Sequence, residues 1–333
     1  MAPQIDVARQ ALICAAVDVQ GETLAAAATA GDRVLGRSDN GAGIDVSLAL
    51  ISEEPSNAMS VDVEEHFQVS AFEDRIRRKE WASHPSRVAR NIDRLLEMFD
   101  DAGAKATFFT LGCVAERHPH VVRSIVANGH EIASHGYSHH RVRNQSPAEY
   151  EEDVTRTRGL LEDLSGTRVR GYRAPSFSIG EDTPWAYDIL QAAGYTYSSS
   201  VYPIRHDHYG STSLSRFPFL VKPGGMLEIP LTTARVFGRN LPCAGGGYFR
   251  LLPVSYSLWA IRRVNAVERM PATFYMHPWE IDPGQPRVPG LSAKTRFRHY
   301  VNLSRFESRL EQTLLRFNWN RMDSVYKNAL PGD

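Results

Sequence analysis

Two histidines four positions apart, His135 and His139, stand in the run S-H-G-Y-S-H-H that begins at Ser134. The run follows a short stretch, E-I-A-S, which is typical of a buried strand. Neutral imidazoles bind zinc, and two of them can share one ion where a turn brings both to one side. Gly136 stands where the zincin motif H-E-x-x-H has its glutamate, so this is not that motif. The spacing predicts two metal ligands, against the alternative of two structural histidines in a turn.

Two acids, Asp62 and Glu64, stand in the sequence S-V-D-V-E-E-H. Alternate residues of a strand share a face, so these two carboxylates should point one way while Val61 and Val63 pack the other way. Neighbouring buried carboxylates are costly unless a cation or an arginine compensates their charge. One acid can therefore be a metal ligand and the other a general base, and the pattern leaves open which is which. The alternative is a solvated acidic turn.

Two later motifs supply groups that would complete a hydrolytic site. Arg173, in R-A-P-S, ends a predicted strand and could orient a carboxylate. His277, in F-Y-M-H-P-W-E, ends an apolar strand and could act as a general acid. Three aromatic residues are candidate faces for stacking on a sugar, although each by itself is more often a packing residue: Tyr137, Tyr248 and Trp279.

The elements that must position these residues are short strands that alternate with helices. Strands rich in Val, Ile, Phe, Tyr and Thr are predicted at 58–63, 106–111, 131–134, 169–173, 195–199, 227–230 and 273–277. Helical patterns lie at 88–99, 121–126, 147–164, 184–193 and 304–317. This alternation predicts a mainly parallel α/β sheet, open or closed into a barrel, with its chemistry at the carboxyl ends of the strands. All four motifs follow that rule.

Composition narrows the class of protein. Lys and Arg together number 38, as do Asp and Glu, so no basic surface for nucleic acid is indicated. No run approaches the ~18 apolar residues of a membrane span. The three cysteines are far apart, which argues against a disulfide framework and favours a reducing compartment. A cytoplasmic location is expected, with a periplasmic one as the alternative, because the first apolar run follows an acid rather than a basic cluster. Residues 1–56 are rich in Ala, Gly, Asp and Ser, and they predict a disordered extension.

Taken together and in this order, the motifs S-V-D-V-E, H-G-Y-S-H, R-A-P-S and F-Y-M-H resemble the polysaccharide deacetylase superfamily, carbohydrate esterase family four. Further stretches, among them V-D-V-E-E-H-F-Q-V, G-G-G-Y-F-R-L-L-P and H-P-W-E-I-D-P, resemble the exosortase-associated deacetylases of bacterial exopolysaccharide loci. The resemblance covers about residues 58–320. It implies a deacetylase domain at 57–325 that includes a family-specific C-terminal part at about 240–325.

The resemblance implies a distorted (β/α) barrel with about seven parallel strands and a divalent metal, most often Zn²⁺. The implied reaction is hydrolysis of N-acetyl groups on an N-acetylhexosamine polymer in exopolysaccharide biosynthesis. Carried over by position, the metal ligands are Glu64, His135 and His139, the catalytic residues are Asp62 as base, Arg173 and His277 as acid, and the substrate-binding residues are Tyr137, Pro175, Tyr248 and Trp279.

This sequence departs from the family at two places. Many members have two adjacent acids, whereas Val63 separates them here, so the roles of Asp62 and Glu64 could be reversed. The usual aspartate near the fifth strand is replaced by Ser198. The alternatives are a non-catalytic carbohydrate-binding protein, an allantoinase-like hydrolase of a small cyclic amide and an O-acetyl esterase.

Overall fold

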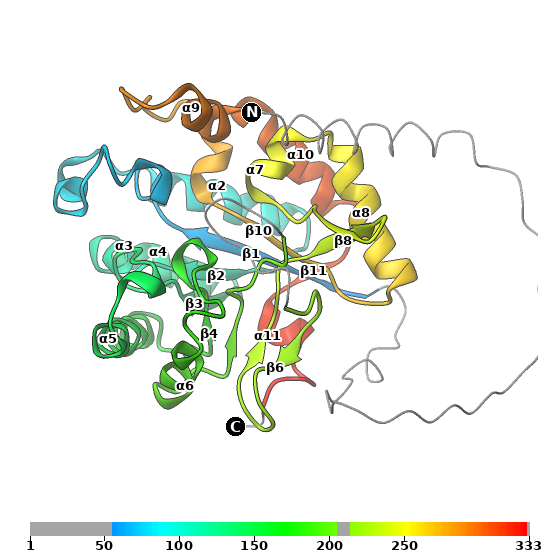
Figure 1. Ribbon diagram of the computed structural model, residues 1–333. Helices are drawn as coiled ribbons and strands as arrows, with labels where there is room; N and C mark the ends of the chain where they lie inside the picture. Colours follow the sequence, from blue (N-terminus) through cyan, green and yellow to red (C-terminus); the bar gives the residue numbers. More distant parts are fainter. Residues whose placement is uncertain (1–54, 205–213, 332–333) are drawn as a thin grey trace, which may run out of the picture. The chain divides into compact units, whose positions relative to one another are not determined.

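A parallel sheet organises the part of the chain that this computed structural model describes, residues 55–204 and 214–331. Seven strands run parallel in the spatial order β10, β1, β2, β3, β4, β5 and β7 (Figure 1). Their bounds are β1 (Asn57–Val63), β2 (Thr107–Thr110), β3 (Glu131–Ser134), β4 (Gly171–Tyr172), β5 (Tyr197–Ser198), β7 (Leu227–Glu228) and β10 (Thr273–Met276). At the edges, β6 (Phe219–Leu220) pairs with β7 in the antiparallel sense and β11 (Trp319–Asn320) pairs with β1 in the parallel sense.

The sheet curls so that its two ends approach each other. After β7 the chain crosses to β10, where the amide of Thr232 donates to the carbonyl of Thr273 at 3.2 Å. Gly245 then forms an isolated parallel bridge with Tyr275. These contacts close most of a barrel, which confirms the predicted distorted barrel of about seven parallel strands. The predicted extension, residues 1–56, lies outside the described ranges except for its last two residues.

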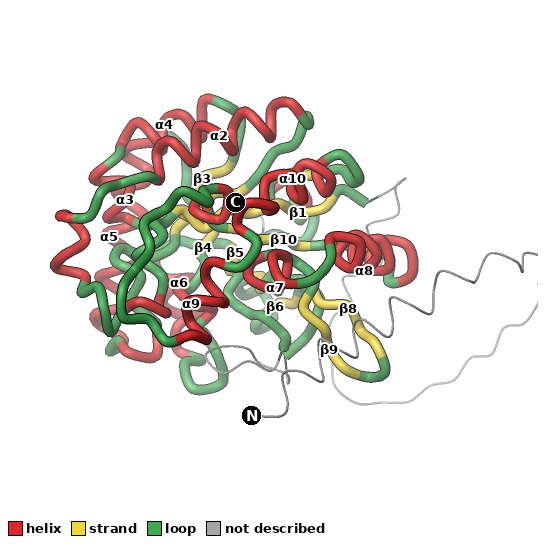
Figure 2. The backbone as a smooth tube through the Cα atoms, turned by 90° about the horizontal axis from the view of Figure 1, so that it is seen from above, coloured by secondary structure: helices red, strands yellow, loops and turns green. Residues whose placement is uncertain are grey.

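Helices cover the outer face of the sheet (Figure 2). They are α2 (Val88–Asp101), α3 (Gly112–Arg117), α4 (Pro119–Ala127), α5 (Pro147–Ser165), α6 (Trp185–Ala192), α7 (Gly246–Leu251), α8 (Val254–Val267), α9 (Ala293–Tyr300), α10 (Leu303–Leu314) and α11 (Met322–Val325). Val61 and Val63 belong to the core between strands and helices, as the alternation along β1 predicts. The intervening Ser60 and Asp62 contact Arg173 on the other face of that strand.

Local sequence explains several helix ends. The amide of Glu149 donates to the hydroxyl of Ser146, while the Glu149 carboxylate accepts from the Ser146 amide. This capping box opens α5, as predicted, and Gly166 closes the helix in the left-handed conformation with φ 65°. Five helices of the described residues lie outside the predicted helical ranges: α3, α7, α8, α9 and α11. The separate two-stranded sheet of β8 (Thr233–Val236) and β9 (Arg239–Pro242) was not predicted either.

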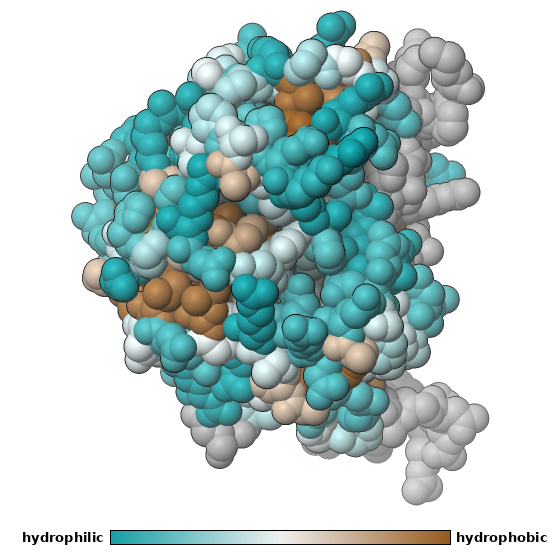
Figure 3. All heavy atoms as spheres, turned by 90° about the vertical axis from the view of Figure 1, so that its left-hand side faces the viewer, coloured by the Kyte–Doolittle hydropathy of each residue, from teal (hydrophilic) through white to brown (hydrophobic). Residues whose placement is uncertain are grey.

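The surface seen in Figure 3 is largely hydrophilic, with apolar residues gathered in a few separate patches. Within residues 55–204 and 214–331, none of the helices has the length and apolar character that a membrane crossing requires. Cys113 and Cys243 are both free thiols.

Candidate metal centre and active site

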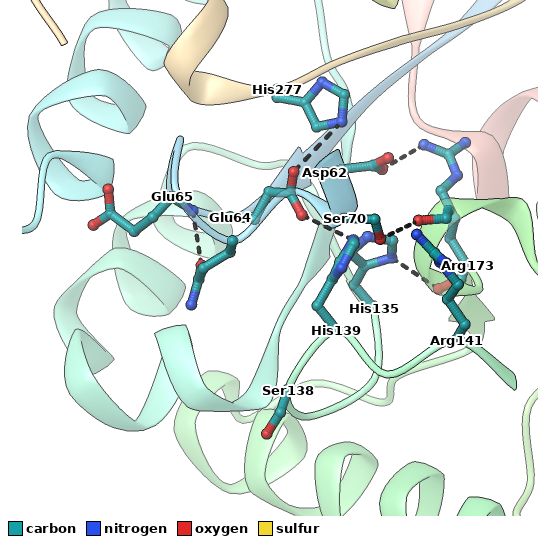
Figure 4. A network of polar contacts seen from close by, with 12 residues as sticks. Asp62, Glu64, Glu65, Ser70, His135, Ser138, His139, Arg141, Arg173 and His277 are labelled. Carbon is teal, nitrogen blue, oxygen red and sulfur yellow. Dashed lines mark hydrogen bonds and ion pairs between the residues drawn. The ribbon is translucent and has the colours of Figure 1, made fainter. Parts of the chain in front are cut away.

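The carboxyl ends of β1, β3, β4 and β10 bring the predicted residues to one place (Figure 4). Glu64 follows β1, and His135 with His139 follows β3. Each of the three side chains offers one ligand atom, and these atoms all lie within 4.8 Å of one another. All three residues are buried. Segments more than sixty residues apart in the sequence therefore form a single three-ligand cluster.

The cluster has the chemistry of a cation site. Oε2 of Glu64 lies 3.1 Å from Nε2 of His139, yet it is a buried atom with no hydrogen-bond partner. Two ligands that each lie ~2.0–2.1 Å from a tetrahedral zinc ion would be ~3.3 Å apart, which is close to this spacing. Oε2 of Glu64 and Nε2 of His139 are close together without a hydrogen bond between them, and a divalent cation could bind both atoms. The residues present therefore fit a metal ion.

The protonation states favour the same conclusion. Burial lowers the pKa of His135 to about 4 and that of His139 well below its usual value, so both rings are neutral and can offer lone pairs. Burial also raises the pKa of Glu64 to about 7, although the charge of His277 opposes this. A bound cation would stabilise the ionised carboxylate that burial penalises.

The two histidines are held in position by their backbone environment. Nδ1–H of His135 donates to the carbonyl of Arg173 at 2.8 Å, which leaves Nε2 for the cluster. His139 has a left-handed backbone with φ 54°, which few non-glycine residues adopt. The Arg78 guanidinium donates to the carbonyls of Ser138 and His139 at 2.8 and 3.0 Å and so stabilises this turn. The ligand loop is thus held by long-range contacts.

Asp62 is distinguished from the three ligands by its partner, Arg173. Nη1 of Arg173 lies 2.6 Å from Oδ1 of Asp62, and the arginine side chain is fully buried. Ser60 and Ser199 accept the remaining guanidinium hydrogen bonds, two of which go to the hydroxyl and carbonyl of Ser199. Glu64 therefore lies with the histidines, and Asp62 is held by an arginine whose own orientation is fixed.

His277 follows β10 and faces the cluster from the opposite side of Glu64 (Figure 4). Its Nε2 is 3.7 Å from Oε1 of Glu64, and its Nδ1 is 3.2 Å from Oε2 of Glu280. Burial lowers the pKa of His277, but the hydrogen bond and charge of Glu280, together with the charge of Glu64, outweigh it and raise the pKa to about 8. The ring thus holds a proton near neutral pH while Nε2 points to the site.

Sequence reasoning missed two residues behind His277. Glu280 is completely buried and accepts from Nε of Arg250 at 2.7 Å, and Arg250 is itself buried on α7. The local sequence does carry a signal for Glu280, because H-P-W-E has the spacing of a capping box with proline at the first helical position. The amide of His277 indeed donates to Glu280.

Trp279 is brought to the site, but not as an open face for a sugar. It is 4% exposed, and its ring stacks against His277 and against His299 with centroid distances of 4.9 and 4.3 Å. Its indole N–H points to Oε1 of Glu64 at 3.5 Å. Burial between two imidazoles argues against the predicted sugar-stacking role and makes Trp279 a support for the candidate ligand Glu64.

The other predicted substrate-binding residues lie in different surroundings. Tyr137 donates to Glu116 of α3 at 2.6 Å, and the guanidinium of Arg156 on α5 covers its ring at 3.8 Å. These contacts turn the side chain toward the helices rather than toward the candidate metal ligands. Pro175 is buried at the start of a short 3₁₀ helix, and Tyr248 on α7 is partly buried against an aromatic cluster.

Two family models match adjacent parts of the chain. Residues 81–198 match the family described as polysaccharide deacetylase. Residues 199–327 match a domain of unknown function, DUF3473. The second match overlaps the C-terminal part predicted at about 240–325, whose boundaries remain a prediction.

Similar sequences carry deacetylase names. A peptidoglycan deacetylase-like protein of Gibberella zeae is 34% identical over 112 residues, which cover 33% of this chain and 32% of that protein. A peptidoglycan-N-acetylglucosamine deacetylase of Bacillus cereus is 34% identical over 94 residues, which cover 28% of this chain and 34% of that one. These alignments span about a third of the relatives' own length.

Similar solved structures confirm the fold. A Mycobacterium smegmatis protein described as a polysaccharide deacetylase aligns with a TM-score of 0.52 at 19% identity, covering 84% of this chain and 93% of that one. Puue allantoinase aligns with a TM-score of 0.53 at 17% identity, covering 87% and 100%. Residues 81–198 thus match the polysaccharide deacetylase family, and the fold of the described residues is similar to that of a polysaccharide deacetylase.

Proposed function

We propose that this protein is a metal-dependent hydrolase that removes N-acetyl groups from an N-acetylhexosamine-containing polysaccharide or oligosaccharide. The observation that carries the proposal is the Glu64–His135–His139 cluster, which lies between an arginine-bound Asp62 and the imidazole of His277. The names of the relatives, which refer to peptidoglycan and N-acetylglucosamine, support the substrate class. A role in exopolysaccharide biosynthesis and a cytoplasmic location remain predictions from the sequence.

Three residues would hold the metal, and Zn²⁺ is the ion that their chemistry favours: Glu64, His135 and His139. A divalent metal bound there supplies Lewis-acid chemistry, because it polarises a carbonyl oxygen and makes water more acidic. The protein's own contribution is to leave the rings neutral and Oε2 of the Glu64 carboxylate without a hydrogen-bond partner.

The remaining residues divide the proton transfers between them. Asp62, held by Arg173, accepts a proton from the attacking water. His277 donates a proton to the departing amine, which makes the amine a competent leaving group. Glu280 accepts from Nδ1–H of His277 and so fixes the tautomer in which Nε2 faces the site. The products are acetate and a free amino sugar.

The experiment measures metal content and acetate release on the purified full chain with a chitin oligosaccharide as substrate. His139→Ala should lose both, and His277→Ala should keep its metal but turn over ~10²–10⁴ times more slowly. His120→Ala is the matched control, because His120 is an exposed histidine on α4 that should change neither measurement.

The same assay separates the alternatives. Acetate release that survives removal of the metal by a chelator would refute the mechanism. Hydrolysis of allantoin without acetate release would favour the cyclic-amide alternative, and metal binding with no turnover on any substrate would favour a carbohydrate-binding protein. Release from O-acetylated but not from N-acetylated sugars would identify an esterase.

A further inference from the structure

The hairpin of β8 and β9 carries an aromatic residue at its tip. Phe237 is 90% exposed, and it forms the two-residue turn with Gly238. Both residues have positive φ, at 46° and 76°. A turn of this kind favours Asn-Gly, and a phenylalanine at its first position is disfavoured both by its backbone and by its contact with water. The hairpin therefore keeps the Phe237 ring in solvent although both its backbone conformation and its exposure are unfavourable. This indicates that the ring contributes to binding rather than to the stability of the fold.

Arginines flank this ring on both faces of the hairpin. In the register, Val236 pairs with Arg239 and Arg235 pairs with Asn240. Successive pairs along a hairpin point to opposite faces, so Arg239 and Arg235 lie on opposite faces. Both arginines are exposed, and neither forms an ion pair with any residue in 55–204 or 214–331. The hairpin tip thus presents the exposed Phe237 ring next to the unpaired positive charges of Arg235 and Arg239.

The charge extends over the adjoining helix. The hairpin packs on α8 through a cluster that includes Ala234, Cys243, Tyr256 and Ala260. Residues 233–269 contain one acid and six arginines, of which one, Arg250, is buried against Glu280, although basic and acidic residues balance over the whole chain. The acid, Glu268, already pairs with Arg216.

Two of the six arginines, Arg262 and Arg269, are exposed without an ion pair in the described ranges. Val267, which lies between them, is 64% exposed. The surface around the hairpin is therefore basic and carries exposed apolar side chains.

We propose that the hairpin tip binds an anionic lipid surface, with Phe237 entering the boundary between headgroups and acyl chains and Arg235 and Arg239 meeting the headgroups. An acidic polysaccharide would also attract arginines, but it favours a groove or a flat aromatic face. Figure 2 shows the hairpin extending away from the sheet beside α8 as a narrow projection. A projecting apolar tip suits insertion into a lipid surface better than it suits the wrapping of a polymer. This inference does not depend on the proposed enzymatic function.

The test is co-sedimentation of the full chain with vesicles of phosphatidylglycerol and phosphatidylcholine in equal parts, compared with phosphatidylcholine alone. Binding is expected only to the mixed vesicles and should weaken as salt is raised, because exposed charges are screened. Phe237→Asn restores the favoured Asn-Gly turn, so it should keep the fold and yet bind about tenfold more weakly. Arg235→Gln and Arg239→Gln should each lose about fivefold.

Matched controls lie elsewhere on the chain. Phe297 on α9 is 56% exposed, and Arg123 on α4 is exposed with no ion pair in the described ranges, so Phe297→Asn and Arg123→Gln should bind as the unmodified protein does. Phe237→Trp should retain binding, because tryptophan is favoured at the membrane interface. Acetate release from a soluble oligosaccharide should be the same in all of these variants.

Three results would overturn the proposal. One is equal binding to the two kinds of vesicle, and another is full binding by Phe237→Asn. The third is binding to soluble dextran sulfate that depends on the arginines but not on Phe237, which would indicate a polyanion site instead.

Discussion

The buried pair of Asp62 and Arg173 allows a quantitative test of how the site is built. The proposed change is Arg173→Met, which keeps most of the side-chain volume but removes every guanidinium hydrogen bond. Asp62 is 2% exposed and would lose its countercharge without gaining water. A buried charge without its partner is much more unfavourable than the loss of both charges together. The Arg173→Met variant should therefore be strongly destabilised.

The expected loss in the free energy of unfolding is about 3–5 kcal/mol for Arg173→Met. A similar loss is expected for Asp62→Asn, which leaves the charge of Arg173 unpaired. The double variant Asp62→Asn with Arg173→Met removes both charges together. It should lose no more than either single variant does, about 3–5 kcal/mol, because a buried ion pair contributes little net stability over an uncharged pair of similar volume. All three variants should lose acetate release.

The assay is urea-induced unfolding at neutral pH, measured on metal-free protein so that changes in metal affinity do not enter the comparison. Arg94→Met is the control, because Arg94 pairs with Glu307 at the surface, where its side chain is 41% exposed, and the loss should stay below about 1 kcal/mol. If the Asp62 and Arg173 changes are simply additive, or if Arg173→Met costs no more than the control, the carboxylate is not held as a buried ion and the assignment of Asp62 loses its physical basis.

Other contacts give further outcomes. Gly245→Ala should lower the free energy of unfolding by about 1–3 kcal/mol in a thermal or urea melt, because the added Cβ would lie 1.8 Å from a backbone oxygen of β10. Trp279→Phe keeps the stacked ring but removes the N–H directed at Glu64, so a chelator competition should show metal binding weakened about tenfold. Asp282→Asn should reduce the acid sensitivity of the fold. Burial raises the pKa of Asp282, but the hydrogen bond and charge of Arg87 outweigh it and hold the pKa below its usual range, so the stability from this pair is present above about pH 4 and is lost as the pH falls through the lower folded value. Unfolding free energies measured across that acidic range should fall less in the variant, and equal pH slopes would contradict the pairing.

Elements with a strong internal period could be predicted from the sequence, whereas elements defined by tertiary contacts could not. The strand at 57–63 and the helix at 147–165 carry alternation or a capping box within a few residues. The hairpin of β8 and β9 lacks the Asn-Gly turn that marks most such hairpins, and its inner face is completed by α8 rather than by its own pattern. Strand β4, expected at 169–173, is a strand only over Gly171–Tyr172, and it shares a single register pair with β3.

In the site too, local sequence predicted where the residues lie, whereas their roles depend on tertiary contacts. The rule that chemistry gathers at the carboxyl ends of parallel strands located every proposed ligand, but it could not distinguish Asp62 from Glu64, since Asp62 lies near the end of β1 and Glu64 directly follows the strand. What separates them is the guanidinium of Arg173, which reaches Asp62 from a strand more than a hundred residues away and makes a second contact with Ser60 beside it.

The same limit explains why the support of His277 was missed. Glu280 is visible in the local pattern H-P-W-E, but its partner Arg250 comes from α7, whose start is placed by Gly245 against β10. A chain of contacts from Arg250 through Glu280 to His277 thus depends on a backbone approach that only a glycine at position 245 permits. Gly245 therefore bears on the proposed acid, His277, by positioning the helix that carries Arg250.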